Sequence, residues 1–287
     1  MKKVLVTGAA GQLGVSLQLH RYSTIKTDVI QSDKSENITI LDISNADQVK
    51  KLLYQENPDM LVHLAAMTNV DGCELKPDLA HQINVQGTEN LLNHFNGKFM
   101  FISSDYVFDG SDGPYSEGDK VRPINIYGQT KLEAEEKVRE LSNNWIILRT
   151  NVVWNIGGNY KASFADWVVE ELKNNRKIRI VDDQWNNPAW TVDLSRVIEQ
   201  LLHFDASGVY HYGSADQLNR YEFARLIANV YELNDDLIEP ITTKELNQPA
   251  KRPLICGLKT NKIEDDFNII PPSTITNIKE AKTLAMK

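Results

Sequence analysis

Residues 4–14 read VLVTGAAGQLG, an apolar run followed by glycines at Gly8, Gly11 and Gly14. The apolar run predicts a buried strand, and the glycines predict a tight turn that leads into a helix. Backbone N–H groups in such a turn, together with the positive end of the helix, can bind a pyrophosphate. The glycine spacing has one residue more than the GxGxxG dinucleotide fingerprint, so a plain tight turn is an alternative interpretation of this stretch alone.

A second pattern lies far downstream, where Tyr127 and Lys131 are four residues apart in the sequence YGQTK. On a helix these two side chains share one face, one turn apart. A phenol can supply the proton that an alkoxide needs during reduction of a ketone. A neighbouring ammonium is expected to lower the pKa of that phenol from about 10 to about 8. A solvated Tyr–Lys pair on an amphipathic helix is the alternative interpretation.

Composition excludes several classes of protein. The chain has 287 residues, of which 41% are hydrophobic, enough for one large or two modest domains. A formal net charge of −8 argues against nucleic-acid and anionic membrane partners, which require clustered Lys and Arg. The two cysteines, Cys73 and Cys256, lack metal-ligand spacing and fit a reducing cytoplasm. No run approaches the roughly 18 apolar residues of a membrane span.

Short apolar runs alternate with longer amphipathic stretches up to about residue 155, which is typical of βαβ units around a parallel sheet. The predicted strands are residues 3–7, 24–27, 60–64, 98–102 and 145–149. The predicted helices run from Gly11 to about His20, from Ser44 to Asn57, from Pro77 to about Leu92 and from Ile126 to Leu141. We therefore expect an α/β fold in which residues 1–155 form a doubly wound, Rossmann-type dinucleotide-binding domain.

The alternation loosens after residue 155, where aromatic residues and Asn-rich turns become frequent. We expect residues 156–287 to form a smaller mixed α/β substrate-binding lobe. Residues 220–231 predict a helix, and residues 250–258 predict a turn or a strand. Because no low-complexity linker separates the halves, we expect the two lobes to be interleaved.

A carboxylate follows the second predicted strand. Asp28 lies 14 residues after Gly14, where a carboxylate can accept hydrogen bonds from the adenosine ribose hydroxyls of a dinucleotide. An acid at this place would repel a 2′-phosphate, so it favours NAD over NADP. Asp33 is a second candidate for the same role.

Further blocks follow the glycine-rich stretch in a fixed order. They are LDI at 41–43, VHLAA at 62–66, NVQGT at 84–88, SSDYVFDG at 103–110 and YGQTKLE at 127–133. In this order the chain resembles the extended short-chain dehydrogenase/reductase superfamily. The SSDYVFDG block, with PYSE at 114–117 and PINIYG at 123–128, is most similar to the dTDP-4-dehydrorhamnose reductases within it. The resemblance implies NAD(P)H-dependent reduction of the 4-keto group of a nucleotide-activated 6-deoxysugar, in dTDP-L-rhamnose biosynthesis.

The resemblance also implies roles for particular residues. The implied catalytic residues are Ser104, which would polarise the substrate carbonyl, Tyr127, which would supply the proton, and Lys131. The implied cofactor-binding residues are Gly8, Gly11, Gln12, Leu13, Gly14, Asp28, Asp42, Ile43, Leu64, Ala65, Ala66 and Lys131, for NAD(H) or NADP(H). The implied substrate-binding residues are Asp105, Tyr106, Asn151, Gln184, Trp185 and Arg252.

Several of these residues have a second interpretation. Arg252 is equally well explained as a fork for a diphosphate and as an exposed surface arginine. Asn84 is expected to bond main chain near the site, and His63 is expected to be a hydrogen-bonded core residue.

The chain departs from the reductase pattern at one place that concerns the sugar. Asn151 stands where the reductases commonly carry a tryptophan against the deoxysugar, and Trp154 comes only three residues later. The sugar platform is therefore expected to be altered. No metal site is expected, because the Asp182-Asp183 pair lacks His or Cys partners and Val15 replaces the acid that a bridging Mg²⁺ would need. The resemblance also implies a homodimer that forms through helices.

Two alternative functions stay open. The first is a nucleotide-sugar epimerase on the same scaffold, which would keep its cofactor tightly bound and return the hydride. The second is a non-catalytic NAD(P)-binding regulatory subunit that resembles the one of methionine adenosyltransferase. A dehydratase is less favoured, because the sequence after Ser104 lacks the Asp-Glu pair that elimination uses.

Overall fold

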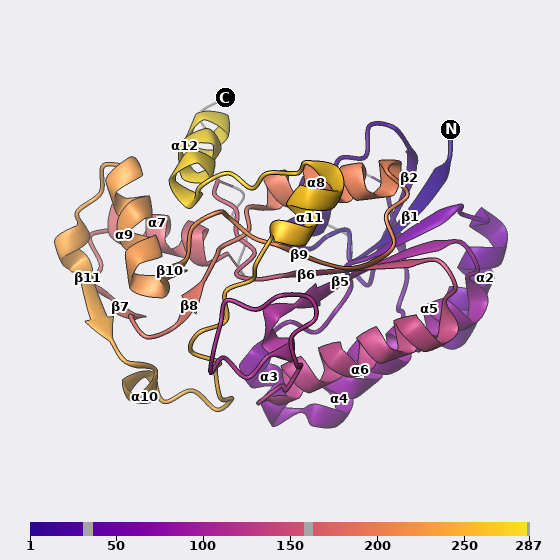
Figure 1. Ribbon diagram of the computed structural model, residues 1–287, viewed down its shortest axis with the longest axis horizontal. Helices are drawn as coiled ribbons and strands as arrows, with labels where there is room; N and C mark the ends of the chain where they lie inside the picture. The colour runs from indigo at the N-terminus through magenta and orange to yellow at the C-terminus, as the bar shows by residue number, and fades with distance from the viewer. Residues whose placement is uncertain (31–36, 158–162, 286–287) are drawn as a thin grey trace.

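A seven-stranded parallel sheet organises the protein (Figure 1), in a computed structural model that describes residues 1–30, 37–157 and 163–285. From edge to edge the strands are β3 (Ile38–Ile40), β2 (Ser23–Asp28), β1 (Lys3–Thr7), β4 (Met60–His63), β5 (Lys98–Ser104), β6 (Trp145–Thr150) and β9 (Gly208–Tyr212). The chain starts in the middle, winds outward to β3, and then returns to β4 beside β1. This order confirms the predicted doubly wound α/β fold.

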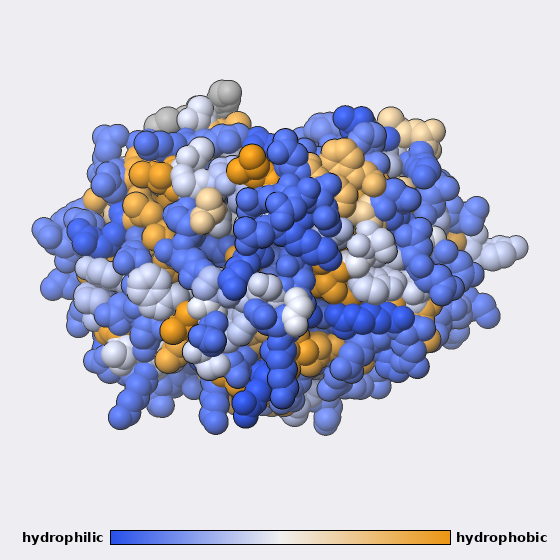
Figure 2. Space-filling view, in the orientation of Figure 1, coloured by the Kyte–Doolittle hydropathy of each residue, from blue (hydrophilic) through white to orange (hydrophobic). Residues whose placement is uncertain are grey.

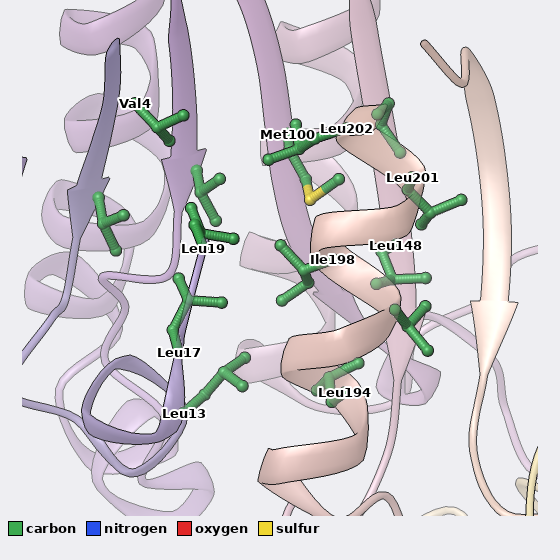
Figure 3. Packing of buried hydrophobic residues seen from close by; sticks show 14 of the residues in the cluster. Val4, Leu13, Leu17, Leu19, Met100, Leu148, Leu194, Ile198, Leu201 and Leu202 are labelled. Atoms are coloured by element: carbon green, nitrogen blue, oxygen red, sulfur yellow. The ribbon is translucent and has the colours of Figure 1, made fainter. Parts of the chain in front are cut away.

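Helices cover both faces of this sheet. One face is covered by α2 (Ala46–Glu56), α5 (Gly87–His94) and α6 (Ile126–Leu141). The other face is covered by α1 (Gln12–Ser16), α8 (Thr191–His203) and α11 (Asn261–Phe267). Figure 3 shows how α8 packs, with Leu194, Ile198 and Leu201 on the side that faces the strands. This i, i+4, i+7 stripe is the pattern of a helix that buries one face.

The remaining elements form a smaller unit beside the main sheet, at the left of Figure 1. Its helices are α7 (Phe164–Lys173), α9 (Arg220–Val230) and α12 (Thr274–Ala285). Its strands form two pairs. One pair is β7 (Ile178–Val181) with β11 (Ile238–Ile241), and the other is β8 (Trp185–Asn186) with β10 (Leu218–Asn219). Three further short helices lie outside these groups: α3 (Val70–Leu75) and α4 (Pro77–His81), which pack against α6, and α10 (Thr243–Leu246). The second half of the chain also supplies α8, β9 and α11 to the main sheet. The surface in Figure 2 is mostly hydrophilic, with hydrophobic residues in separate groups.

The structure corrects the first two predicted helices. α1 ends at Ser16 and not near His20, because Leu17 turns into an extended conformation that lets Leu17 and Leu19 reach the core. α2 is capped by Asn45, whose side chain accepts a hydrogen bond from Gln48, and not by Ser44. The predicted capping pattern was therefore placed one residue too early.

The third predicted helix contains a π-helical turn at Gln82–Gln86, between α4 and α5. The hydrophobic periodicity of the sequence does not indicate this turn, in which hydrogen bonds span five residues and not four. The predicted helices at 126–141 and 220–231 match α6 and α9. The 250–258 segment is irregular and pairs only through isolated bridges. In the described parts of the chain no helix combines the length and the apolar character needed to cross a membrane.

The turn after β1 requires glycine for two different reasons. Gly8 has a φ of +71°, in the left-handed region that glycine occupies most readily. At Gly14 the limit is space, because a Cβ there would lie 2.4 Å from the Gly8 carbonyl oxygen and 2.5 Å from Ala9 Cα. Backbone, and not a movable side chain, occupies the volume.

We predict that Gly14→Ala lowers the free energy of unfolding by about 1–3 kcal/mol, because the backbone of the turn must move to admit the methyl group. Gly118→Ala is the matched control, since nothing lies within 4 Å of its would-be Cβ. Urea unfolding of both variants measures the difference. Equal stability of the two variants would contradict the account of the turn.

Candidate active site

The predicted site residues gather where the parallel strands end. Gly8 follows β1, Asp28 ends β2, Leu64 follows β4, Ser104 ends β5 and Asn151 follows β6. In open α/β sheets a ligand binds at this carboxyl edge, near the point where the strand order reverses. That point lies here between β1 and β4.

Close backbone contacts build the glycine-rich turn. Leu64 N donates to the Thr7 carbonyl oxygen at 3.2 Å, and Ala65 N donates to Thr7 Oγ1 at 3.3 Å. Ala65 N would lie 2.6 Å from a Cβ on Gly8, so the segment after β4 lies directly against the turn. Asp42 and Ile43 lie in the loop after β3, where the Asp42 carboxylate accepts from Ser44.

Asp28 is part of the turn as well as a candidate ribose ligand. Its Oδ2 accepts a hydrogen bond from Ala10 N at 2.9 Å, which ties the glycine-rich turn to β2. Its Oδ1 accepts a longer one from Ile30 N at 3.3 Å. The competing candidate Asp33 lies outside the described residues.

The residues of this edge fit a nicotinamide dinucleotide. Gln12 Oε1, Thr150 Oγ1 and Asn151 Oδ1 are buried and have no hydrogen-bond partner within the described parts of the protein. Buried polar atoms of this kind are costly unless a ligand or water satisfies them. Gln12 Nε2 donates to the Val153 carbonyl oxygen, so its amide joins the start of α1 to the loop after β6. The turn itself has the close backbone approach that a pyrophosphate site needs.

The proposed proton donor lies beside Ser104. Tyr127 is in the first turn of α6, whose start is fixed by Asn125 Oδ1, which accepts from Gly128 N at 2.8 Å. Burial raises the pKa of Tyr127, and a hydrogen bond with Ser104 partly opposes that rise. The phenol therefore keeps its proton at neutral pH, as an acid must. The ring of Tyr106 meets the Tyr127 ring edge-on, with centroids 5.6 Å apart.

The prediction that Lys131 lowers the pKa of Tyr127 is wrong for this structure. Lys131 Nζ donates to the Ile102 carbonyl oxygen at 2.7 Å and lies 4.0 Å from the centroid of the Phe101 ring. Burial has the largest influence on the phenol, and it raises the pKa of Tyr127 where the prediction expected a lowered one. Burial instead lowers the pKa of Lys131 itself to about 7, while the charge of Glu135 acts in the opposite direction.

Two predicted supporting residues behave as expected. Asn84 lies in the π-helical turn; its Oδ1 accepts from Met67 N at 2.7 Å, and its Nδ2 donates to the Met67 carbonyl oxygen and to Thr130 Oγ1. It therefore bonds main chain near the site. His63 is buried between Thr7 and Thr88, at 2.7 and 3.0 Å, as a hydrogen-bonded core histidine.

Asp105 connects the two halves of the molecule. It is 1% exposed; Ser104 Oγ donates to its Oδ1 at 3.1 Å, and Asn186 Nδ2 of β8 donates to its Oδ2 at 3.0 Å. Burial raises the pKa of Asp105 to about 7, although hydrogen bonds from Ser104 and Asn186 and the charge of Arg220 act to lower it. The carboxyl thus changes charge near neutral pH.

Other predicted substrate residues are held inside the protein or lie elsewhere. Asn151 is buried and donates to Asn187 Oδ1, and Gln184 is buried and donates to Thr243 Oγ1. Trp185 lines a surface pocket of about 770 Å³ on the smaller unit. Trp154 is fully buried and stacked near Trp190, so it does not present a face for a sugar.

Arg252 is neither free nor exposed. Its Nη1 and Nη2 bind the two carboxylate oxygens of Asp71 at 2.7 and 2.9 Å, and its side chain is 9% exposed. The pair ties the C-terminal segment to α3. A diphosphate would have to share this guanidinium with Asp71.

Arg220 was not among the residues predicted from the sequence. Its charge lies close enough to interact with Tyr106, Asp105 and Arg252, and its guanidinium carbon is 5.4 Å from the centroid of the Phe164 ring. In the described parts of the chain it forms no ion pair. A single arginine at the start of α9 forms no motif, and only the fold brings it towards the SSDYVFDG segment.

A Rossmann-type sheet with a serine, a tyrosine and a lysine at its carboxyl edge defines an NAD(P)-dependent oxidoreductase of the extended short-chain dehydrogenase/reductase superfamily. A family model described as the RmlD substrate binding domain matches residues 1–285. The chain belongs to this family.

Relatives of known name agree with that membership. A dTDP-4-dehydrorhamnose reductase of Aggregatibacter actinomycetemcomitans is 32% identical over 300 residues, covering 99% of this chain and all of the relative. The structure of a dTDP-4-dehydrorhamnose reductase from Bacillus anthracis in complex with NADP has 30% sequence identity and a TM-score of 0.87. The match covers 99% of this chain and 100% of that chain. Methionine adenosyltransferase 2 subunit beta of Bos taurus is 32% identical over 277 residues, which cover 92% of this chain and 82% of that protein.

We predict that Asp105→Asn flattens the pH dependence of stability between about pH 4 and 7. The folded protein holds the Asp105 proton up to about pH 7, whereas the unfolded chain loses it near pH 4. The contribution of Asp105 to stability is therefore fully present below about pH 4 and is lost as pH rises through this window, by on the order of 4 kcal/mol. Urea unfolding of wild type and variant at several pH values measures the free energy of unfolding. Parallel curves of this free energy against pH would contradict the raised pKa of Asp105.

Proposed function

We propose that this protein reduces the 4-keto group of a dTDP-activated 6-deoxysugar with NAD(P)H, in the manner of a dTDP-4-dehydrorhamnose reductase. The observation that carries the proposal is the protonated Tyr127 phenol beside Ser104, at the carboxyl edge of a dinucleotide-binding sheet. The named reductases that match along the whole chain support the choice of substrate.

The chain's own residues supply the proton and the orientation. When bound, the reduced nicotinamide supplies the hydride. Ser104, whose hydroxyl now donates to Asp105, turns to donate to the substrate carbonyl oxygen and polarises it. Tyr127 gives its proton to the alkoxide as that charge forms. Lys131 stays close by as a cation that binds the nicotinamide ribose.

The smaller unit is the place for the nucleotide sugar. Asn186 of β8 contacts Asp105, and Arg220 of α9 lies near Asp105 and Tyr106, so this unit reaches the catalytic residues. We take the smaller unit, which residues 156–287 form apart from α8, β9 and α11, as the substrate-binding lobe on this ground. Arg220 forms no ion pair with a carboxylate within the described residues, and such a guanidinium is suited to a phosphate of the nucleotide. A homodimer in the cytoplasm is part of the same proposal.

A non-catalytic regulatory subunit is the second candidate function. It is favoured by the similarity to methionine adenosyltransferase 2 subunit beta, which covers 92% of this chain and 82% of that protein. This candidate predicts that the chain binds the dinucleotide but does not turn over. Ser104, Tyr127 and Lys131 are all present, which supports the reductase.

We predict that Tyr127→Phe lowers kcat for reduction of dTDP-4-keto-6-deoxy-L-mannose by about 10²–10⁴-fold, because the alkoxide loses its proton donor. Dinucleotide binding should stay close to that of wild type, since the ring remains. Loss of NAD(P)H absorbance measures turnover, and quenching of protein fluorescence measures binding. Binding without turnover in the wild type would reject the reductase and favour the regulatory subunit.

We predict that Asp28→Asn raises the ratio of kcat/KM with NADPH to kcat/KM with NADH by about tenfold, because it removes a charge that repels the 2′-phosphate. The asparagine side-chain oxygen can still accept from Ala10 N, so the turn should be kept. Asp47→Asn, in the exposed first turn of α2, is the control. An unchanged ratio would mean that Asp28 serves the turn and not cofactor choice.

A further inference from the structure

A buried acid lies one helical turn beyond the catalytic lysine. Tyr127, Lys131 and Glu135 follow one another at intervals of four residues along α6 and so share one face of the helix. Glu135 is 0% exposed and Lys131 is 4% exposed. The proposed reaction uses the tyrosine and the lysine, but it leaves the reason for a buried carboxylate in this place unexplained.

Four donors surround the Glu135 carboxylate. Ser103 Oγ at 2.6 Å and Arg149 Nε at 2.8 Å donate to Oε1, while Arg149 Nη2 at 2.7 Å and Arg139 Nη2 at 2.8 Å donate to Oε2. Burial alone would raise the pKa of Glu135, but the hydrogen bond and charge of Arg149, with the other donors, hold that pKa below its usual range. The residue is therefore an anion inside the protein.

Lys131 has no ion-pair partner within the described parts of the chain. Its Nζ donates to the Ile102 carbonyl oxygen and lies over the Phe101 ring, both on β5. On β4, His63 faces it as a neutral imidazole, because burial and the charge of Lys131 lower the pKa of His63 to about 3. On α6 itself, Glu135 is the charge that counteracts the effect of burial on Lys131.

The remaining charges near this group lie beyond Glu135. Arg149 of β6 is 2% exposed and is bound to Glu135, and Arg139 of α6 reaches the same carboxylate from the surface. His211 of β9 contacts Arg149 at 3.4 Å and is neutral, since burial and then Arg149 lower its pKa to about 3. Glu135 thus separates the cation at the site from the arginines behind it.

We propose that Glu135 is a positioning residue for the reduction: its buried negative charge keeps Lys131 an ammonium, and its bonds to Ser103 and Arg149 fix α6 against β5 and β6. Ser103 directly precedes Ser104 and pairs in register with Arg149, so the same carboxylate fixes the strand that carries the serine. The proposal rests on the proposed function only for its effect on turnover. Its effect on the charge of Lys131 stands without it.

Glu135→Gln tests the proposal, because it removes the charge and keeps the shape. In protein without cofactor, the ¹⁵N resonance of Lys131 Nζ, assigned with Lys131→Met, reports the pH at which the amine loses its proton. We expect this midpoint to fall by about two pH units, from the Coulomb interaction across one helical turn at an effective dielectric of about 20. The alkaline fall of kcat should move to lower pH by the same amount, with little change in KM.

Ser103→Ala is the matched control, since it removes one hydrogen bond to Glu135 and leaves the charge in place. We expect its Lys131 midpoint to stay within a few tenths of a pH unit of wild type. If Glu135→Gln does not fold, the double variant Glu135→Gln with Arg149→Gln removes the buried ion pair together, a change that proteins often tolerate. Its Lys131 midpoint is compared with that of Arg149→Gln, so that only the Glu135 charge differs, and is expected to be lower.

An unchanged Lys131 midpoint in the folded variant would overturn the proposal and leave Glu135 with a structural role only. A lowered midpoint supports it even if the wild type shows no turnover. In that case the proposed reduction fails while the link between Glu135 and Lys131 holds. The two failures are therefore distinguishable.

Discussion

Packing of α6 against β5 is the contact on which the site depends. The helix supplies Tyr127 and Lys131, and the strand supplies Ser104 and the Ile102 carbonyl oxygen that holds the lysine. Ala134 and Val138 bury the inner face of the helix. Because these apolar contacts set the distance between helix and strand, they also set the distance between the proton donor and the group that polarises the carbonyl.

The cofactor side of the site rests on a different kind of contact, the close approach of backbones. Gly8 lies directly against Ala65, and Gly14 lies against the Gly8 carbonyl, so the turn has no room for side chains. Asp28 then fixes the turn to β2 through Ala10 N. A short, rigid turn that leads into the N-terminus of a helix is what a pyrophosphate requires.

Local patterns in the sequence predicted five of the seven strands of the main sheet to within two residues and predicted α6 with its correct ends. The two edge strands, β3 and β9, were not predicted. The local patterns failed where a distant contact decides the outcome. α1 ends before Leu17, and both Leu17 and Leu19 are buried in the core. The π-helical turn places the side chain of Asn84 within hydrogen-bonding distance of the Met67 backbone. Neither the early end of α1 nor the π-helical turn can be read from hydrophobic periodicity, because each depends on contacts with other parts of the structure.

The same limit applies to the site. Residues inside the ordered family blocks lie at the carboxyl edge, because strand ends meet there in any parallel sheet. The partners of the long cations were not predictable: Lys131 binds a carbonyl and not the phenol, and Arg252 binds Asp71. Long side chains reach groups on other elements, and only the fold specifies which groups those are.

The central claim is that this site transfers hydride to the C4 carbonyl of a dTDP-sugar. The most direct measurement uses NADPH or NADH carrying deuterium at the transferable C4 position, with dTDP-4-keto-6-deoxy-L-mannose as substrate, and analyses the sugar product by NMR. The account predicts one deuterium at C4 of the sugar for each nicotinamide oxidised. Unchanged keto sugar in the presence of bound dinucleotide would contradict it.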